Sequence, residues 1–140
     1  MLTSLEQYGH FIYTVRERFP SILSSTLVLI GTGIATATVR GEITFKNDIT
    51  LVVAEAITFA RERGRIARYG YEVWRGGEKL YWYDAQPHPD DPLLAETHPH
   101  HKHVPPNIKR NRIPAPGLSF ERPNLPFLIE EIERESLTLP

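Results

Sequence analysis

The chain has 140 residues, the length of one domain, and contains no cysteine. The absence of thiols excludes a disulfide framework, a thiolate zinc finger and a cysteine nucleophile. Lysine and arginine total 16 against 17 acids, for a net charge of -1, so the whole chain is not a polycation and any nucleic-acid role needs a local patch.

The first predicted element is a helix that ends before Pro20. Thr3 and Glu6 fit a capping box, which satisfies free N–H groups of the first helical turn. Apolar residues then recur every three or four positions, which places them on one helical face: Leu5, Tyr8, Ile12, Val15 and Phe19. Proline cannot continue a helix, so Pro20 ends it.

A β-hairpin is predicted next. Residues 26–45 are rich in valine, isoleucine and threonine, with an interruption near residues 31–33. A three-residue loop at Lys46–Asp48 gives the cross-strand pairs Ile43 with Leu51, Gly41 with Val53, Val39 with Glu55, Ala37 with Ile57 and Ala35 with Phe59. One face of the hairpin is then almost wholly apolar. Because a one-residue slip would turn that set to the other face, residues 49–59 are predicted as strand.

A second hairpin is predicted around Gly76 and Gly77. It places Val73 opposite Leu80, Tyr71 opposite Trp82 and Tyr69 opposite Asp84, so the bulky side chains again share a face. The regular α+β part of the chain is expected to end near residue 86.

Ten of the twelve prolines lie in residues 86–126, where they exclude helix and disfavour a central strand. Residues 87–123 are therefore predicted as a long loop. Asn124 is then predicted to cap a helix over residues 124–136, with Leu125, Leu128, Ile129 and Ile132 packed inward and Glu130, Glu131, Glu133 and Glu135 facing water. The prediction is one α+β domain over residues 1–140, in which an antiparallel sheet of four to six strands packs against an N-terminal and a C-terminal helix.

The proline-rich segment also carries a histidine cluster. Five of the six histidines lie within sixteen residues: His88, His98, His100, His101 and His103. Residues 98–112 add Lys102, Lys109, Arg110 and Arg112 and no acid, which is typical of an anion-binding loop.

Three kinds of chemistry fit this cluster. Two imidazoles can act as acid and base in metal-free RNA cleavage, with Lys102 stabilising the charged phosphate. Neutral imidazoles can instead bind zinc, nickel or copper, with Asp84 or His88 completing the site. A solvated histidine-rich loop that packs or binds phosphate is the third interpretation.

Glu55 and Asp84 are not placed like surface charges. On the predicted registers, Glu55 lies in the middle of an apolar face and Asp84 ends the face that holds Leu80 and Trp82. Each carboxylate can orient a histidine or bind a metal. The structural alternative for Glu55 is a buried pair with an arginine such as Arg68.

A second basic run precedes the aromatic strands, at Arg61, Arg63, Arg65 and Arg68. It is either a solvated edge or one wall of a groove whose aromatic residues stack single-stranded bases. The candidate nucleic-acid-binding residues are Arg68, Tyr69, Lys109, Arg110 and Arg112. The two interpretations of Tyr69 are a packing residue, the usual role of a tyrosine in a strand, and a hydrogen-bond donor to Asp84.

The segment Tyr83–His88, followed after a short gap by His98–Val104, resembles the TumE-type family of toxins from toxin–antitoxin modules. The resemblance spans most of residues 25–132, and its specific part is the Pro-His-His-Lys-His core. It implies a toxin held inactive by a cognate antitoxin, often one with a helix-turn-helix domain. The family positions that transfer are Asp84, His100, His101, Lys102 and His103. The chain departs from the family pattern at Trp82–Ala85 and at His88, which is followed by proline instead of a second histidine.

Together these residues predict an endoribonuclease toxin that uses no metal and no cofactor. Two of His100, His101 and His103 act as acid and base, Lys102 stabilises the phosphate and Asp84 orients a histidine, with Glu55, His88 and His98 in support. The alternatives are a metal-dependent nuclease with a His/Asp site and a non-enzymatic nucleic-acid-binding subunit. We expect a cytoplasmic protein without membrane contact, since no targeting segment or span of about 20 apolar residues is present. The expected substrate is RNA, and the sequence is compatible with a homo-oligomer.

Overall fold

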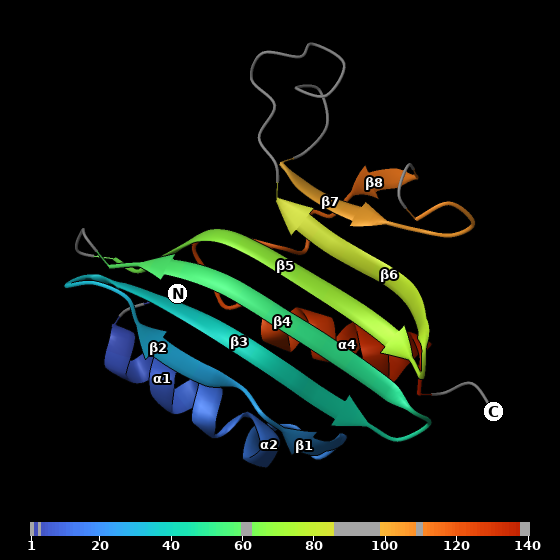
Figure 1. The fold of residues 1–140 in the computed structure, drawn as a ribbon, viewed down its shortest axis with the longest axis horizontal. Helices are drawn as coiled ribbons and strands as arrows, with labels where there is room; N and C mark the ends of the chain where they lie inside the picture. The colour runs from blue at the N-terminus through green and yellow to red at the C-terminus, as the bar shows by residue number, and fades with distance from the viewer. Residues whose placement is uncertain (1, 3, 60–62, 86–98, 109–110, 138–140) are drawn as a thin grey trace, which may run out of the picture.

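The computed structural model describes residues 2, 4–59, 63–85, 99–108 and 111–137. Over these residues the chain forms one antiparallel sheet of eight strands and three helices (Figure 1). The helices are α1 (Leu5–Tyr13), α2 (Val15–Arg18) and α4 (Leu125–Glu135). The strands are β1 (Ile22–Ser25), β2 (Val28–Gly31), β3 (Thr36–Phe45), β4 (Ile49–Thr58), β5 (Arg65–Arg75), β6 (Glu78–Ala85), β7 (His100–His103) and β8 (Arg112–Pro114). None of the described helices is long and apolar enough to cross a membrane.

The strands follow one another across the sheet almost in chain order. The order is β1, β3, β4, β5, β6, β7 and β8, and β2 pairs with β3 beside β1. Turns of two or three residues join β3 to β4 and β5 to β6, whereas fourteen residues separate β6 from β7. Figure 1 shows β7 and β8 beyond β6, at the far end of the sheet from β1 and β2.

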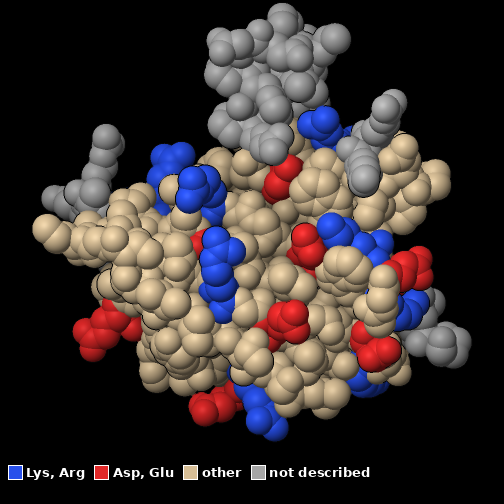
Figure 2. Space-filling view, viewed as in Figure 1, with Lys and Arg blue, Asp and Glu red and all other residues tan. Residues whose placement is uncertain are grey.

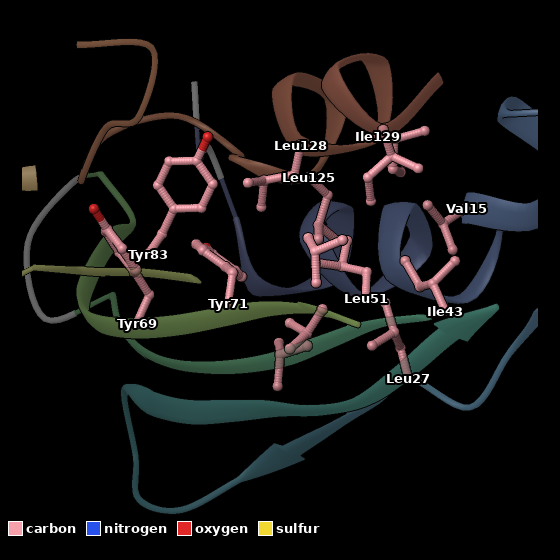
Figure 3. Packing of buried hydrophobic residues seen from close by; sticks show 14 of the residues in the cluster. Val15, Leu27, Ile43, Leu51, Tyr69, Tyr71, Tyr83, Leu125, Leu128 and Ile129 are labelled. Carbon is pink, nitrogen blue, oxygen red and sulfur yellow. The ribbon is translucent and has the colours of Figure 1, made fainter. Parts of the chain in front are cut away.

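Helices α1 and α4 lie on the same face of the sheet (Figure 3). In β4, the odd-numbered residues from Ile49 to Ile57 are buried and the even-numbered ones are partly exposed. The buried set packs against Leu125, Leu128 and Ile129 of α4, which are fully buried. We call this side the helix-covered face and the other side the helix-free face.

The N-terminal helix packs as predicted but is capped one residue later. Its N-cap is Ser4, whose side chain accepts a hydrogen bond from the Gln7 N–H, whereas the predicted cap was Thr3, which lies outside the described residues. Tyr8, Ile12 and Val15 are buried, which confirms the apolar face. The single predicted helix is nevertheless divided in two, because Thr14 separates α1 from α2.

The register of the β3–β4 hairpin is confirmed. Ile43 pairs with Leu51, Gly41 with Val53, Val39 with Glu55 and Ala37 with Ile57, and the Phe59 N–H donates to the Ala35 carbonyl. In the connecting turn Asn47 and Asp48 have positive φ angles of 62° and 64°. Asparagine and aspartate tolerate this left-handed backbone better than most residues, which is why the turn forms there.

The predicted register of β5 against β6 is wrong beyond the first two pairs. Next to the turn Arg75 pairs with Glu78 and Trp74 with Lys79, but then Val73 pairs with Tyr81 instead of Leu80. Leu80 is the extra residue of a β-bulge, and a bulge turns every later side chain to the opposite face. Tyr81 and Tyr83 consequently face the helices, and Gly70 instead of Tyr69 lies opposite Asp84.

The proline-rich segment contains two strands where a loop was predicted. β7 pairs with both β6 and β8 and is therefore an internal strand. The prolines do not prevent this, because Pro99 and Pro105 flank β7 and Pro114 ends the edge strand β8, where no further ladder bond is needed. These strands, with β1 and β2, raise the number to eight in place of the predicted four to six.

Helix α4 has the predicted apolar face, but the predicted exposure of one of its acids is wrong. Leu125, Leu128, Ile129 and Ile132 are fully buried. Glu131, expected in water, is only 5% exposed. Asn124 stands at the N-cap without a side-chain cap bond, because its amide donates to the Tyr71 hydroxyl and the Ser119 carbonyl and accepts from the Ser119 N–H.

Candidate active site

The pairing of β6 with β7 decides where each histidine points. The opposed residues are Trp82 with His103, Tyr83 with Lys102, Asp84 with His101 and Ala85 with His100. Because strand side chains alternate between faces, His101 and His103 share the helix-free face with Asp84, and His100 and Lys102 lie on the helix-covered face. The structure thus brings two of the predicted site residues to Asp84 and takes two away from it.

Asp84, His101 and His103 form what we call the Asp84 cluster. The Oδ1 atom of Asp84 lies 3.1 Å from Nε2 of His103 and 3.9 Å from Nδ1 of His101. The first distance is that of a hydrogen bond, and the second is that of a neighbouring group without a direct bond. A carboxylate so close to two imidazoles can fix a ring orientation and stabilise a positive charge on either ring.

The His103 ring is held rigidly. It lies flat on the indole of Trp82, with ring centroids 3.6 Å apart and planes 4° apart. The Trp82 N–H donates to the Ile108 carbonyl at 3.1 Å, which fixes the indole in turn. Two rotatable side chains are thereby locked into one geometry, which is a requirement for a positioned acid or base.

One ring nitrogen of His103 is left without a hydrogen bond by the described residues. Its Nδ1 atom is buried, and no described residue gives it a hydrogen bond. Buried polar atoms without partners are rare and cost about 1–3 kcal/mol each. When the Nε2–H donates to Asp84, the neutral ring carries its lone pair on this Nδ1 atom, which can then accept a proton.

On the helix-covered face, Lys102 ties β7 to α4. Its Nζ atom lies 3.1 Å from Oε2 of Glu131, and the Tyr83 hydroxyl donates to the same carboxylate at 2.7 Å. Burial, followed by the bond to Glu131, raises the pKa of Tyr83, so its phenol stays protonated and remains a donor. Lys102 is thus committed to a largely buried ion pair away from Asp84.

His100 is committed to a second contact on the same face. Its Nδ1 atom lies 2.6 Å from the Tyr69 hydroxyl, and its ring stacks on Tyr69. Burial, followed by the charge of Asp84, raises the pKa of Tyr69, so this phenol also stays protonated. Tyr69 is 7% exposed, which removes it from the surface where a base could stack on it.

Glu55 lies in the core, bonded to tyrosines and not to a histidine or an arginine. Its carboxylate accepts hydrogen bonds from the hydroxyls of Tyr8 in α1 and Tyr71 in β5. Burial raises the pKa of Glu55, and the two tyrosine bonds act in the opposite direction. This carboxylate joins α1 to the centre of the sheet and does not reach the Asp84 cluster. Arg68, its suggested partner, lies on the helix-free face opposite Ala56.

A continuous row of directly opposed residues crosses the helix-free face and runs through the Asp84 cluster: Arg40, Ala54, Gly70, Asp84, His101 and Pro114. No side chain fills the middle of the row, because Gly70 has none and a Cβ atom there would meet nothing within 4 Å. Arg112 lies opposite His103 on the same face and is exposed. Figure 2 shows this side of the molecule, where lysines and arginines are interspersed with acids and form no continuous basic surface.

Four predicted residues cannot be placed. His88, His98, Lys109 and Arg110 lie outside the described residues. Within the described part of the chain, no group of three or more histidine, cysteine, aspartate or glutamate side chains could hold a metal ion. A metal site completed by His88 therefore stays a prediction.

Sequence reasoning missed three residues that shape the site. Trp82 fixes His103, Glu131 binds Lys102, and the Tyr83 hydroxyl donates to the same Glu131 carboxylate. The usable signal was the order of the core motif itself: in a strand, His-His-Lys-His places its first and third residues on one face and its second and fourth on the other.

The comparison with protein families agrees with the sequence resemblance. The family described as Toxin TumE matches residues 15–136, which is most of the 140-residue chain and includes every strand and α4. No curated protein and no solved structure matches the chain.

Proposed function

Since the chain belongs to the TumE toxin family, we propose that it is an endoribonuclease toxin whose reaction takes place at the Asp84 cluster. The observation that carries this proposal is the hydrogen bond between Asp84 and His103 beside His101, on the face that the helices leave open. A toxin of such a family is expected to have a cognate antitoxin, and a helix-turn-helix antitoxin is part of what we propose.

His103 acts as the base and His101 as the acid. Nδ1 of His103 takes the proton of a ribose 2′-hydroxyl, and the 2′ oxygen then bonds to the neighbouring phosphorus. The bond from phosphorus to the 5′ oxygen breaks, and protonated His101 gives its proton to that oxygen. The products are a 2′,3′-cyclic phosphate and a 5′-hydroxyl end, and no metal or water is consumed.

A cation must stabilise the extra negative charge on the phosphate in the transition state. Lys102 was the predicted cation, but its ammonium group is bonded to Glu131 on the opposite face. Arg112 lies opposite His103 on the helix-free face and is exposed, so we assign this role to Arg112. Arg68, exposed on the same face, is placed to bind a neighbouring phosphate.

RNA can reach the two imidazoles only when their surroundings move. His101 is 1% exposed and His103 is 3% exposed. The hydrogen bond from the Trp82 N–H to the Ile108 carbonyl holds the turn after β7 beside His103. We therefore propose that this turn shifts when RNA binds, as catalytic geometry often completes only in the substrate complex.

The first test replaces His103 with glutamine. The Gln amide keeps a donor near Asp84 but cannot accept and return a proton, so RNA cleavage should fall by about 100-fold or more. Cleavage is measured on purified protein with 5′-end mapping, and His10→Gln, at an exposed position on α1, is the matched control. Full cleavage by folded His103→Gln protein would overturn the proposed chemistry.

Chelation separates the metal-dependent alternative in the same assay. EDTA should leave cleavage unchanged if the imidazoles move the protons themselves. Loss of cleavage with EDTA, restored by one added divalent metal, would replace this mechanism with a metal-dependent nuclease at the same residues.

The near-complete burial of both imidazoles favours one other function, a toxin that binds nucleic acid without cutting it. Binding would then fall steeply with added salt, and no RNA would be cut under any metal condition. In that case Arg68→Ala and Arg112→Ala would reduce toxicity, and His103→Gln would not.

A further inference from the structure

We propose that the edge formed by β1 and β2 pairs with the same edge of a second copy of the chain, and that the Tyr13 hydroxyl keeps this edge closed in the single chain. The hydroxyl accepts a hydrogen bond from the Leu29 N–H at 3.1 Å and donates to the Leu29 carbonyl at 3.4 Å. It therefore occupies both backbone groups that the middle of β2 offers to a new strand. The inference does not depend on RNA cleavage.

Strands β1 and β2 act as one continuous edge. Both pair only with β3 among the described strands, and they share one register, since Ser25 pairs with Ile43 and Val28 with Arg40. The Thr26 N–H between them donates to the Glu42 carbonyl of β3. Even-numbered residues thus bond inward, and the backbone groups of odd-numbered residues such as Leu29 point away from the sheet.

The strands of this edge carry no charged side chain of their own. Residues 19–39 contain no ionisable side chain, although the chain as a whole is 24% charged. The opposite edge, β8, is only three residues long and contains Arg112 and Pro114. Short length, charge and proline, as in β8, are the usual features that keep an edge strand from pairing with another chain. Two copies can therefore meet along β1 and β2 without like-charge repulsion between the strand residues. Besides Tyr13, the Ser25 hydroxyl occupies the Leu27 N–H, and Arg16 and Glu17 of α2 line the hollow beside the edge.

The edge is also complementary to itself. A two-fold axis through Leu29 lets each copy's Leu29 exchange N–H and C=O bonds with the other, using the groups that Tyr13 now occupies. The same axis places Val28 of one copy opposite Ile30 of the other on the helix-free face. Both residues are exposed in the single chain, at 41% and 53%. Pairing buries these apolar side chains against each other, which an unrelated charged strand could not do.

Space for the change exists beside the edge. A hollow of about 470 Å³ lies between the α1–α2 segment and the edge, and Tyr13, Ser24 and Leu27 are among its lining residues. Tyr13 is 60% exposed and can turn away from Leu29 at little cost. A strand-only contact buries less than the about 800 Å² per partner of a tight complex, so the dimer is expected to be weak in the wild type.

The first test removes only the hydroxyl. Tyr13→Phe should lower the dimer dissociation constant by about tenfold, because the edge no longer has to break two hydrogen bonds before it pairs. Sedimentation velocity over a concentration series measures this constant, with thermal unfolding to confirm the fold. Adding Ile30→Lys to Tyr13→Phe should return the protein to a monomer. A monomeric Tyr13→Phe protein at every concentration would overturn the proposal.

The second test checks the register of the dimer by disulfide cross-linking. The chain has no cysteine of its own that could form competing disulfides. Val28→Cys and Ile30→Cys proteins, mixed under oxidising conditions, should form a covalent dimer in much higher yield than either alone, because the two positions are opposed across the axis. Equal cross-linking by each single variant would contradict this register. If Ile30→Lys abolished binding of the cognate antitoxin to a chain that stays monomeric, the edge would serve a partner's strand and the second-copy proposal would fail.

Discussion

The two faces of β7 differ in what their side chains are committed to. On the helix-covered face, His100 is bonded to Tyr69 and Lys102 to Glu131. On the helix-free face, His103 bonds to Asp84 through one nitrogen, and its other nitrogen has no partner in the described structure. The difference teaches that a strand divides a four-residue motif in two: one half attaches the strand to the core, and the other half is the one to which we assign the proposed chemistry.

The four-residue motif lies on a strand at the far end of the sheet, and this placement separates its side chains. A loop would let all four side chains converge, but a strand divides them by alternation. The attached half holds β7 against α4 and β5, which positions the other half opposite Asp84 and Trp82. Variants on the covered face should therefore change stability first, and variants on the helix-free face should change activity first.

The largest effect on the covered face should come from alkaline pH. Burial is the first cause of a raised pKa for five tyrosines in the core between that face and the helices: Tyr8, Tyr69, Tyr71, Tyr81 and Tyr83. A raised pKa means that their contribution to stability is complete below pH 10 and is lost above it, as the unfolded chain ionises and the folded chain does not. Each should cost about 1.4 kcal/mol per pH unit above 10.

Absorbance at 295 nm and far-ultraviolet circular dichroism, followed together above pH 10, check this expectation. The signal of the five buried phenolates should appear only with unfolding. Phenolate formation at these positions in a chain that stays folded would show that the covered face is open to water.

A smaller effect should follow from breaking the ion pair of β7 with α4. Lys102→Ala leaves Glu131 largely buried without its cation, and the free energy of unfolding should fall by about 2–3 kcal/mol. The double variant Lys102→Met/Glu131→Leu should recover most of the loss, because neither charge then remains buried. Denaturant unfolding of the single and double variants measures both. An unchanged unfolding midpoint in Lys102→Ala would mean that this pair does not hold β7 in place.

The sequence predicts local features well where turn chemistry and alternation agree. Lys46–Asp48 fixes the β3–β4 register because only one pairing makes the face of Leu51 and Val53 apolar. The β5–β6 register could not be read in this way, since Leu80 and Trp82 form as bulky a face as Tyr81 and Tyr83, and nothing local marks Leu80 as a bulge.

The candidate site could be predicted in composition but not in arrangement. The histidines and Asp84 are visible in the sequence, but their division between two faces depends on β7 being a strand between flanking prolines. The burial of Glu131 depends on Lys102, which lies 29 residues away, so no periodicity within α4 reveals it. Long-range pairs of this kind are decided by tertiary packing.

The most direct test of the divided motif compares all four positions of β7 in one RNA-cleavage assay on purified, folded protein. His101→Asn and His103→Gln should each lose about 100-fold or more of the cleavage rate. His100→Asn and the stability-compensated Lys102→Met/Glu131→Leu variant should retain most of it. Equal losses at all four positions, or losses confined to His100 and Lys102, would contradict the assignment of catalysis to the helix-free face.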